Sequence, residues 1–373
     1  MDATAAPLAP NVRVLLVDSG DAREADTRQD GIPKDFPADV VRVCTGTAPI
    51  LGKPSEDPTA AAHSLLAEPG VRAVVLLTRE GTLDSPAESG LVFGSLERCC
   101  EPDGADHIVA LLLAAQHPPR ARLVVVTGVR GGLGASTFLL HLARAGHAGG
   151  KRVALVDADP AGGLGLLMGD GVLPGLRWAD LPADEPAFRP ERLVAALPAW
   201  LGMPVITGDG RGGVRSPGQL RPVLDALRAE HDLVLLDLPR GAVPPADATV
   251  MLMSGLDLRS AVAAEALAAR LKGTSRTGRA DPGDRAPTGP DPNPAEPRKV
   301  YTVIRRIGED VTPDELALMT RTEIVAVLPH DRAVAQRIAR GDDPTRGRGA
   351  LRTQARAVAA RLLGDNPHEE AQW

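Results

Sequence analysis

The 373-residue sequence is short of cysteine, of aromatic residues and of long apolar runs. Three cysteines, Cys44, Cys99 and Cys100, provide no disulfide framework and no metal-ligand spacing. Four Phe, three Trp and one Tyr leave few rings on which single-stranded bases could stack. No apolar run reaches the roughly 18 residues that span a bilayer, and the first residues lack the basic start and apolar core of a signal peptide. We therefore expect a cytoplasmic protein.

Charge is unevenly distributed along the chain. The formal net charge is −6, and residues 1–118 hold twice as many acidic as basic residues, whereas the remainder is slightly basic. A duplex-binding protein would present a continuous basic surface instead. We therefore expect no specific nucleic-acid binding.

Residues 1–118 predict a small α/β domain. Apolar strands are expected at 11–18 and 72–78, and helices at 58–68 and 105–116. The prolines that follow, in the segment 117–120, stop the last helix and favour extended backbone, so we place the domain boundary at 118/119.

The opening of this domain resembles a response-regulator receiver. The first strand ends in Asp18, as it does in receivers, but the candidate third strand ends in Thr78, where a receiver carries its phospho-acceptor aspartate. The acidic pair near the first strand is also incomplete. We expect a degenerate receiver-like domain that is not phosphorylated.

Residues 119–363 alternate strands with helices, the pattern of a parallel sheet covered on both faces. The fold class predicted is α/β: a mostly parallel, doubly wound P-loop domain preceded by the smaller receiver-like domain. Residues 273–298 hold almost nothing that could be buried and predict a disordered insertion, and 364–373 predict a flexible tail. The expected strands are 122–127, 152–157, 203–207, 232–237, 248–253, 300–304 and 323–328, and the expected helices are 136–147, 217–229 (N-cap Ser216), 257–271, 313–320 (capping box from Thr312 to Glu315), 331–340 and 350–363.

The most informative segment is LVVVTGVRGGLGASTFLL, residues 123–140. A buried strand runs into a glycine-rich turn and then into a helix, the context in which backbone N–H groups and a helix N-terminus can bind phosphate. The usual pattern is G-x-x-x-x-G-K-[ST]. Gly128 and Gly134 have the required spacing and Ser136 occupies the Mg²⁺-binding hydroxyl position, but Ala135 stands where the lysine is expected.

Two further strands end in carboxylates. RVALVDAD ends in Asp157 and Asp159, and DLVLLD ends in Asp237. A single aspartate at a strand end is often only a helix cap. Together with the glycine-rich turn, three such aspartates favour a site for a Mg²⁺–nucleotide.

The order R-G-G-L-G-A-S-T, V-D-A-D-P and L-L-D-L-P resembles the MinD/ParA superfamily with its deviant Walker A motif, over roughly residues 121–363. The alanine and the receiver-like domain resemble its CpaE/TadZ branch, which includes actinobacterial septum-site-determining and CpaE-like proteins. The resemblance implies ATP and Mg²⁺ as ligands, with Asp159 as the water-orienting acid, Asp157 as its partner, and Ser136 and Asp237 at the metal. The nucleotide-contacting positions that it implies are Arg130, Gly131, Gly132, Gly134, Ala135, Ser136 and Thr137, together with Pro329 and Asp331 near the adenine.

Two positions depart from the family pattern. Arg130 replaces the signature lysine, which in the family crosses a homodimer interface to the partner's phosphates, and Ala135 replaces the P-loop lysine. Losing one charge-assisted phosphate contact costs about 1.5–3 kcal/mol of binding, and hydrolysis depends still more on such charges. We expect weak ATP binding and weak or absent hydrolysis. Arg130 could instead supply the missing charge across a homodimer, or remain a solvated loop residue.

The resemblance implies a spatial positioning protein that acts with division proteins at the septum or with pilus and secretion proteins at the pole. The alternative is an active ParA-type ATPase that partitions cargo or DNA. The last helix places Leu351, Ala355, Val358 and Leu362 on one face. This face could pack on the sheet, or it could support peripheral association with the inner face of the membrane, as in MinD proteins.

Overall fold

The computed structural model describes ten stretches of the chain. The predicted helix at 58–68 (apart from residues 66–67), the insertion at 273–298 (apart from its two end residues) and the tail beyond residue 364 lie outside the described residues. The described residues are 12–18, 39–44, 66–67, 71, 73–78, 91–95, 104–169, 174–183, 185–273 and 298–364.

The chain divides into two compact units, and the main break falls between Arg120 and Ala121. The first unit consists of Met1–Arg120 with Asp184–Leu193 and Arg221–Ala229, and the second consists of the remaining residues. The two units are described separately below.

The first unit contains a four-stranded parallel sheet with the strand order β2-β1-β3-β4. Its strands are β1 (Val12–Asp18), β2 (Asp39–Cys44), β3 (Ala73–Thr78) and β4 (Leu91–Ser95), and helix α3 (Gly104–Gln116) packs against β3 and β4. This order equals the first four strands of the flavodoxin-like arrangement 2-1-3-4-5 that receivers share. Asp18 ends β1 and Thr78 ends β3, its neighbour in the sheet, so the third strand does end in threonine.

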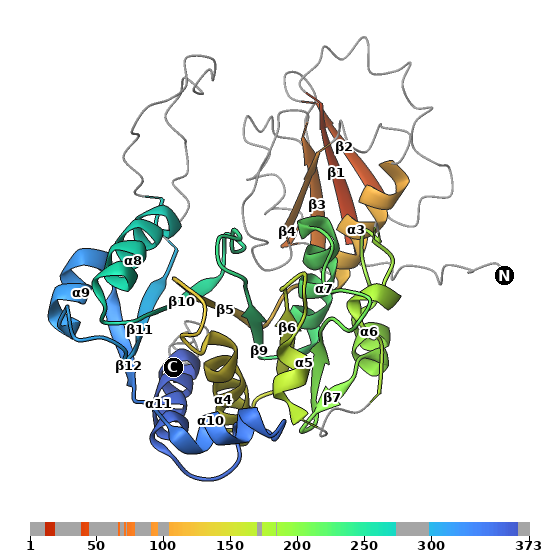
Figure 1. Ribbon diagram of the computed structural model, residues 1–373. Helices are drawn as coiled ribbons and strands as arrows, with labels where there is room; N and C mark the ends of the chain where they lie inside the picture. Colours follow the sequence, from red (N-terminus) through yellow and green to blue (C-terminus); the bar gives the residue numbers. More distant parts are fainter. Residues whose placement is uncertain are drawn as a thin grey trace. The chain divides into compact units, whose positions relative to one another are not determined.

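The second unit is built on an eight-stranded sheet with the order β12-β11-β10-β5-β9-β6-β8-β7 (Figure 1). All pairings are parallel except the one between β7 and β8. Each of the seven strands predicted for this part of the chain is present within about a residue. The strands are β5 (Arg122–Gly128), β6 (Val153–Asp157), β7 (Ala199–Trp200), β8 (Met203–Ile206), β9 (Leu233–Asp237), β10 (Thr249–Ser254), β11 (Val300–Arg305) and β12 (Glu323–Leu328).

The helices follow the expected alternation. The predicted N-caps are confirmed: the Ser216 hydroxyl accepts from the Gln219 amide, and Thr312 and Glu315 form the capping box. The helices are α4 (Ala135–Ala148), α5 (Leu164–Leu167), α6 (Pro190–Ala196), α7 (Pro217–Glu230), α8 (Leu258–Leu271), α9 (Pro313–Thr320), α10 (Arg332–Ala339) and α11 (Ala350–Gly364), with a 3-10 turn at Trp178–Asp180.

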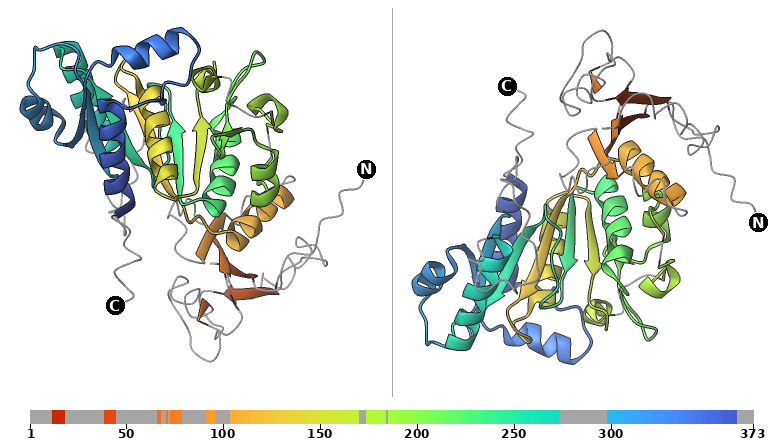
Figure 2. Two further views of the ribbon diagram at one scale, coloured as in Figure 1. Left: turned by 90° about the horizontal axis from the view of Figure 1, so that it is seen from below. Right: turned by 90° about the horizontal axis from the view of Figure 1, so that it is seen from above.

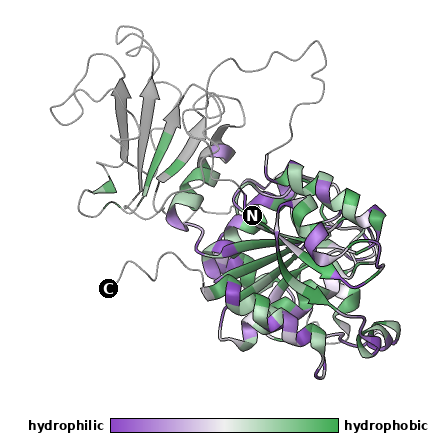
Figure 3. Cartoon of the chain, turned by 90° about the vertical axis from the view of Figure 1, so that its left-hand side faces the viewer, coloured by the Kyte–Doolittle hydropathy of each residue, from purple (hydrophilic) through white to green (hydrophobic). Residues whose placement is uncertain are grey.

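The central strands of the second unit form the core. β5, β6, β9 and β10 are buried over nearly their whole length and are apolar, as Figure 3 shows. Strands covered on both faces read as continuous apolar runs, which is why the sequence predicted them well. The polar side chains of these strands therefore lie at the strand ends and in the loops that follow them.

Helix α11 packs inside the second unit. It lies beside α4 and contacts β12 (Figure 2), and its predicted apolar face, Leu351, Ala355, Val358 and Leu362, is buried. Of the two alternatives for this face, the structure shows packing within the domain, against α4 and β12. Within the described residues, no helix combines the length and the apolar character needed to cross a membrane.

Candidate phosphate-binding site

The site is built on the loop that joins β5 to α4. Gly132 and Gly134 have φ values of +79° and +86°, in the left-handed region that favours glycine. A Cβ atom at Gly131, Gly132 or Gly134 would meet no heavy atom within 4 Å, so space lies open beside this backbone. The first helical hydrogen bond runs from the Phe138 amide to the Gly134 carbonyl at 2.9 Å. The preceding amides lie at the positive end of the helix dipole, where an anion is stabilised.

Ser136 and Asp237 meet at this loop. Asp237 ends β9, which pairs directly with β5, and the Ser136 hydroxyl lies close enough to its carboxylate to favour the charged form. Ser136 lies in the first turn of α4, and the next residue, Thr137, is buried. Mg²⁺ at phosphate sites takes one or two protein oxygens and completes its shell with phosphate oxygens and water. The Ser136 hydroxyl and the Asp237 carboxylate are such a pair.

Burial raises the pKa of the Asp237 carboxyl to about 7, and the nearby charges of Asp157 and Asp159 act in the same direction, while the Ser136 hydroxyl opposes them. The carboxyl group is therefore poised to lose its proton near neutral pH when a cation arrives.

Asp157 is a buried carboxylate, 1% exposed, at the end of β6 opposite Asp237. One oxygen accepts from the Thr207 hydroxyl at 2.7 Å and the Leu164 amide at 3.0 Å, and the other accepts from the Asp159 amide at 3.1 Å. Burial raises its pKa, and the same hydrogen bonds oppose the rise. These bonds use both oxygens to hold the segment after β6, so Asp157 acts here as an organiser of that loop.

Asp159 is half-buried within that segment. Its Oδ1 accepts from the Ala161 amide at 2.9 Å, which closes a local turn, and Gly213 lies so close that a Cβ there would meet the Asp159 carbonyl at 2.2 Å. The second carboxylate oxygen, Oδ2, has no hydrogen bond among those of the described residues. Of the two predicted catalytic acids, Asp159 is the one with an oxygen still free for a ligand or water.

Arg130 is bound to helix α8. Its Nε donates to the Ser260 hydroxyl at 2.7 Å, and its NH2 donates to Asp257 Oδ2 at 2.9 Å. The Ser260 hydroxyl also donates to Asp257 Oδ2 at 2.7 Å, and Asp257 caps α8 through the Ser260 amide. Although burial acts to raise it, these hydrogen bonds lower the pKa of Asp257 to about 2. The guanidinium at the signature position is thus held at α8, although 33% of the Arg130 side chain is exposed.

No lysine reaches the phosphate loop from position 135. Ala135 is half-buried and begins α4, so its methyl group stands where a P-loop cation is expected. The glycine loop and the two neighbouring oxygen-bearing side chains, Ser136 and Asp237, are present, and the local cation, Arg130, is bound to α8. The arrangement suits a bound anion with reduced charge compensation.

Pro329 and Asp331 lie apart from this group. They follow β12, which is separated from β5 by β10 and β11. The Pro329 carbonyl accepts from Arg305 NH1 at 2.7 Å, and Asp331 caps α10 by accepting from the Ala333 and Val334 amides. The structure therefore gives Asp331 a capping role.

Four residues that support the site were not singled out as site residues from the sequence: Thr207, Trp178, Asp257 and Ser260. Trp178 is fully buried and its indole donates to the Asp157 carbonyl at 2.7 Å, which ties the 3-10 turn to the end of β6. Asp257 and Ser260 have the spacing of a helix N-cap, a signal that predicts the cap but not the contact with Arg130.

Residues 121–279 match the family model "Cellulose biosynthesis protein BcsQ". An uncharacterized protein of Mycobacterium tuberculosis strain H37Rv, Rv3660c, is 34% identical over 204 residues, which are 52% of this chain and 54% of that protein. The chain thus spans about half the length of the curated relatives it matches.

Among solved structures, a ParA family ATPase from Chlorobium tepidum matches with a TM-score of 0.52 at 15% identity, covering 65% of this chain and 99% of that one. The MinD cell division protein of Aquifex aeolicus matches 66% of this chain and 98% of its own, with a TM-score of 0.46 and 15% identity. The likeness to the ParA family ATPase shows the fold of the second unit, which is a mostly parallel α/β sheet with helices, of the MinD/ParA P-loop type.

Proposed function

We propose that this chain is a MinD/ParA-type spatial positioning protein that binds Mg²⁺–ATP weakly and hydrolyses it slowly or not at all. The observation that carries the proposal is the position of the Ser136 hydroxyl next to the Asp237 carboxylate beside an open glycine loop, in a site where position 135 is alanine. The metal-binding half of a nucleotide site is kept, and the phosphate-binding cation is missing. A bound nucleotide would then act as a conformational signal more than as a fuel.

In this proposal, the glycine loop binds the phosphates and Ser136 and Asp237 hold Mg²⁺, which would neutralise part of the phosphate charge. Asp159 orients a water through its free oxygen, and Asp157 fixes the loop that carries Asp159. Without a lysine at position 135, charge that builds up on the phosphates during transfer is poorly stabilised. Binding is weakened less than hydrolysis is.

The alternative, an active ParA-type ATPase, needs Arg130 to act as the missing cation. Arg130 is bound to Asp257 and Ser260 within the same chain, so it would have to break both contacts to reach phosphate in its own or a partner's site. A homodimer formed with ATP supplies one route, in which each Arg130 crosses to the other subunit. Sedimentation with and without Mg²⁺–ATP, on wild type and Arg130→Ala, tests this route: a nucleotide-dependent dimer lost in the variant supports it, and an unchanged monomer contradicts it.

We also propose that residues 1–118 form a receiver-like domain without phospho-acceptor function and that residues 119–363 form the nucleotide domain. The parallel order β2-β1-β3-β4 and the end of β3 at Thr78 support this division. Treatment with beryllofluoride or acetyl phosphate should leave the protein unmodified. A stoichiometric acyl phosphate would contradict the proposal.

The cellular role that we propose is marking a site for division proteins at the septum or for pilus and secretion proteins at the pole. Both roles place the protein in the cytoplasm, peripherally at the inner face of the membrane. Localisation of a fluorescent fusion, followed by capture of partners, separates the two.

The biochemical proposal is tested by equilibrium dialysis of the full-length chain with Mg²⁺–ATP. We expect saturable binding that is lost in Ser136→Ala and in Asp237→Ala. Asp232→Ala is the matched control, because that aspartate pairs with Arg152 at the surface away from the loop. Equal binding by all four proteins, or none by wild type, would overturn the proposal.

A further inference from the structure

Two loops of the second unit meet at one edge of its sheet. Loop 158–163, which carries Asp159, follows β6, and the hairpin loop 207–213 follows β8, which pairs with β6 in parallel. The Gly213 amide donates to the Pro160 carbonyl at 2.7 Å. The two loops are therefore directly connected beside the candidate site.

Glycine lets these two loops pack backbone against backbone. A Cβ atom at Gly213 would lie 2.2 Å from the Asp159 carbonyl oxygen, and one at Gly208 would lie 3.0 Å from the Gly162 Cα atom. Nonbonded carbon atoms attract one another at about 3.5–4.0 Å and repel at much shorter distances. No side chain therefore fits at either position unless the opposite loop moves.

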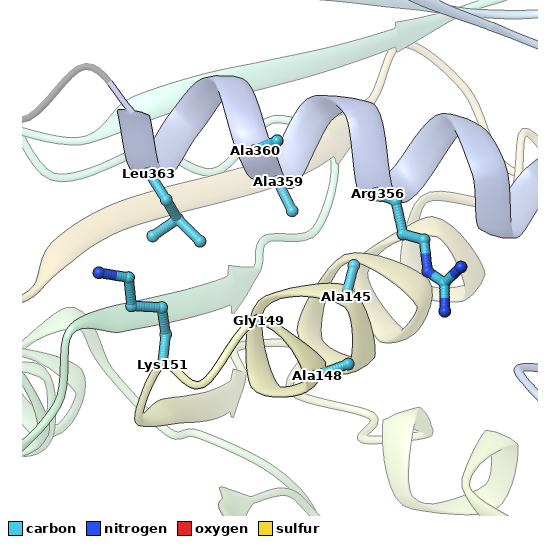
Figure 4. Close-up of a pocket in the computed structure, with 8 residues that line it drawn as sticks. All are labelled: Ala145, Ala148, Gly149, Lys151, Arg356, Ala359, Ala360 and Leu363. Atoms are coloured by element: carbon cyan, nitrogen blue, oxygen red, sulfur yellow. The ribbon is translucent and has the colours of Figure 1, made fainter.

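Small residues alone do not produce such close packing. Between α4 and α11, alanines and a glycine line a groove of about 400 Å³ (Figure 4). At the two loops, by contrast, Gly208 and Gly213 have no room for a single added carbon atom. The close approach of the loops is therefore a specific feature of this part of the fold.

The hairpin loop is also fixed on its other side. Arg211 donates from NH1 to Asp180 Oδ1 and from NH2 to Asp209 Oδ2, both at 2.6 Å, which ties the hairpin loop to the 3-10 turn. At the base of the hairpin loop, the Thr207 hydroxyl donates to Asp157 Oδ2 at 2.7 Å. Because both sides are held, a restraint on one loop is passed to the other and is not absorbed between them.

We propose that the hairpin loop 207–213 is the positioning element for Asp159 and that it carries the nucleotide signal to the protein surface. This inference rests on the proposed function, in which the free Oδ2 atom of Asp159 holds a water beside the bound phosphates. When that water restrains Asp159, the contact at Gly213 restrains the hairpin loop as well. The tip of the hairpin loop, at Gly210 and Arg211, is exposed, so the restraint reaches a surface that a partner protein can contact.

Hydrogen exchange of the full-length chain, read by mass spectrometry with and without Mg²⁺–ATP, tests this coupling. At a nucleotide concentration that equilibrium dialysis shows to be saturating, we expect the amides of residues 208–213 to exchange about fivefold more slowly, which is the effect of one further hydrogen bond. A chain that binds ATP without this slowing overturns the inference and leaves the proposed function standing. A chain that binds no ATP overturns the proposed function, and the inference with it.

Two glycines of the hairpin loop provide a matched pair of variants. In Gly213→Ala the new methyl group meets the Asp159 carbonyl, so we expect the nucleotide-dependent slowing to be lost at saturating ATP. In Gly210→Ala the methyl group meets no heavy atom within 4 Å, and the φ angle of this residue lies outside the left-handed region, so we expect the same slowing as in wild type. Circular dichroism checks that both variants are folded.

The variant Asp159→Asn tests the route of the signal without disturbing the contact at Gly213. It keeps an oxygen that can accept from the Ala161 amide, as Asp159 Oδ1 does at 2.9 Å, and it replaces the free oxygen by an NH₂ group that cannot accept a hydrogen bond. At saturating ATP we expect this variant also to lose the slowing at residues 208–213. Slowing of wild-type size in either Asp159→Asn or Gly213→Ala, or an equal loss of slowing in Gly210→Ala, overturns the proposal.

Discussion

If the glycine loop binds phosphate, a lysine introduced at position 135 should increase the affinity for Mg²⁺–ATP. Ala135 begins α4, directly before Ser136, and the glycines of the loop leave open space beside the backbone. A lysine introduced at position 135 occupies the position at which the P-loop pattern carries its phosphate-binding lysine. The change Ala135→Lys adds one charge-assisted contact, worth about 1.5–3 kcal/mol. That energy corresponds to roughly tenfold to a hundredfold tighter binding of Mg²⁺–ATP.

The same variant should change the titration of Asp237. An ammonium group within about 6 Å lowers the pKa of a carboxyl by about 1–3 units, so the pKa near 7 falls and metal-dependent binding loses its pH dependence around neutrality. Isothermal titration calorimetry at several pH values measures both effects. Ala135→Met is the control, because methionine has a similar length and helix propensity but no charge. Equal affinities for the lysine and methionine variants would refute the assignment of this loop to phosphate.

Three further predictions concern titration and the Arg130 contact. Because folding raises the pKa of Asp237 to about 7, Mg²⁺–ATP binding should be about tenfold weaker at pH 6 than at pH 8. In the nucleotide-free protein, the same pKa shift lowers the free energy of unfolding as the pH rises from about 4 to 7. Thermal denaturation of Asp237→Asn should therefore show stabilisation at about pH 8 and none at about pH 4, and an equal effect at both pH values would contradict this. Among the described residues, neither ring nitrogen of His141 has a hydrogen-bond partner, and burial lowers the pKa of this histidine to about 4 although Asp343 and Asp331 act to raise it. The free energy of unfolding should therefore fall by about 2 kcal/mol between pH 7 and pH 5 through this residue, and urea titrations of His141→Leu should show that much less loss. Asp257→Asn keeps a helix cap but removes the charge that binds Arg130. In a filter-binding assay we expect this variant to bind ATP more tightly than wild type, and we expect the added change Arg130→Ala to cancel the gain. If Asp257→Asn binds ATP like wild type, the contact does not restrain Arg130.

Local signals explain which parts of the fold the sequence predicts. The strands of the second unit are continuous apolar runs, and helices α7 and α9 begin at Ser216 and Thr312, whose capping patterns are complete within four residues. β2, β4, α5, α6 and the two-residue β7 were not predicted. β2 lies inside a segment rich in Pro, Asp and Gly and shows no regular alternation, and β7 is too short to show a period.

The contacts of the candidate site also divide into those that a local motif predicts and those that it does not. The loop glycines, Ser136 and Asp237 follow a motif with fixed spacing, and parallel pairing of β5 with β9 brings them together. The contact of Arg130 with Asp257 joins residues 127 positions apart. No local pattern specifies such a contact, because it depends on β10 lying next to β5 and delivering the start of α8 beside the loop.

The central claim is that the chain keeps a metal-binding pair but has weakened catalysis. The most direct test is to measure ATP turnover by the purified full-length chain. The nucleotide concentration should be one that equilibrium dialysis shows to be saturating. The account predicts bound ATP with phosphate release near the uncatalysed background, unchanged in Asp159→Ala. Rapid turnover that is abolished in Asp159→Ala would contradict it, because the site would then hydrolyse ATP without a lysine at position 135.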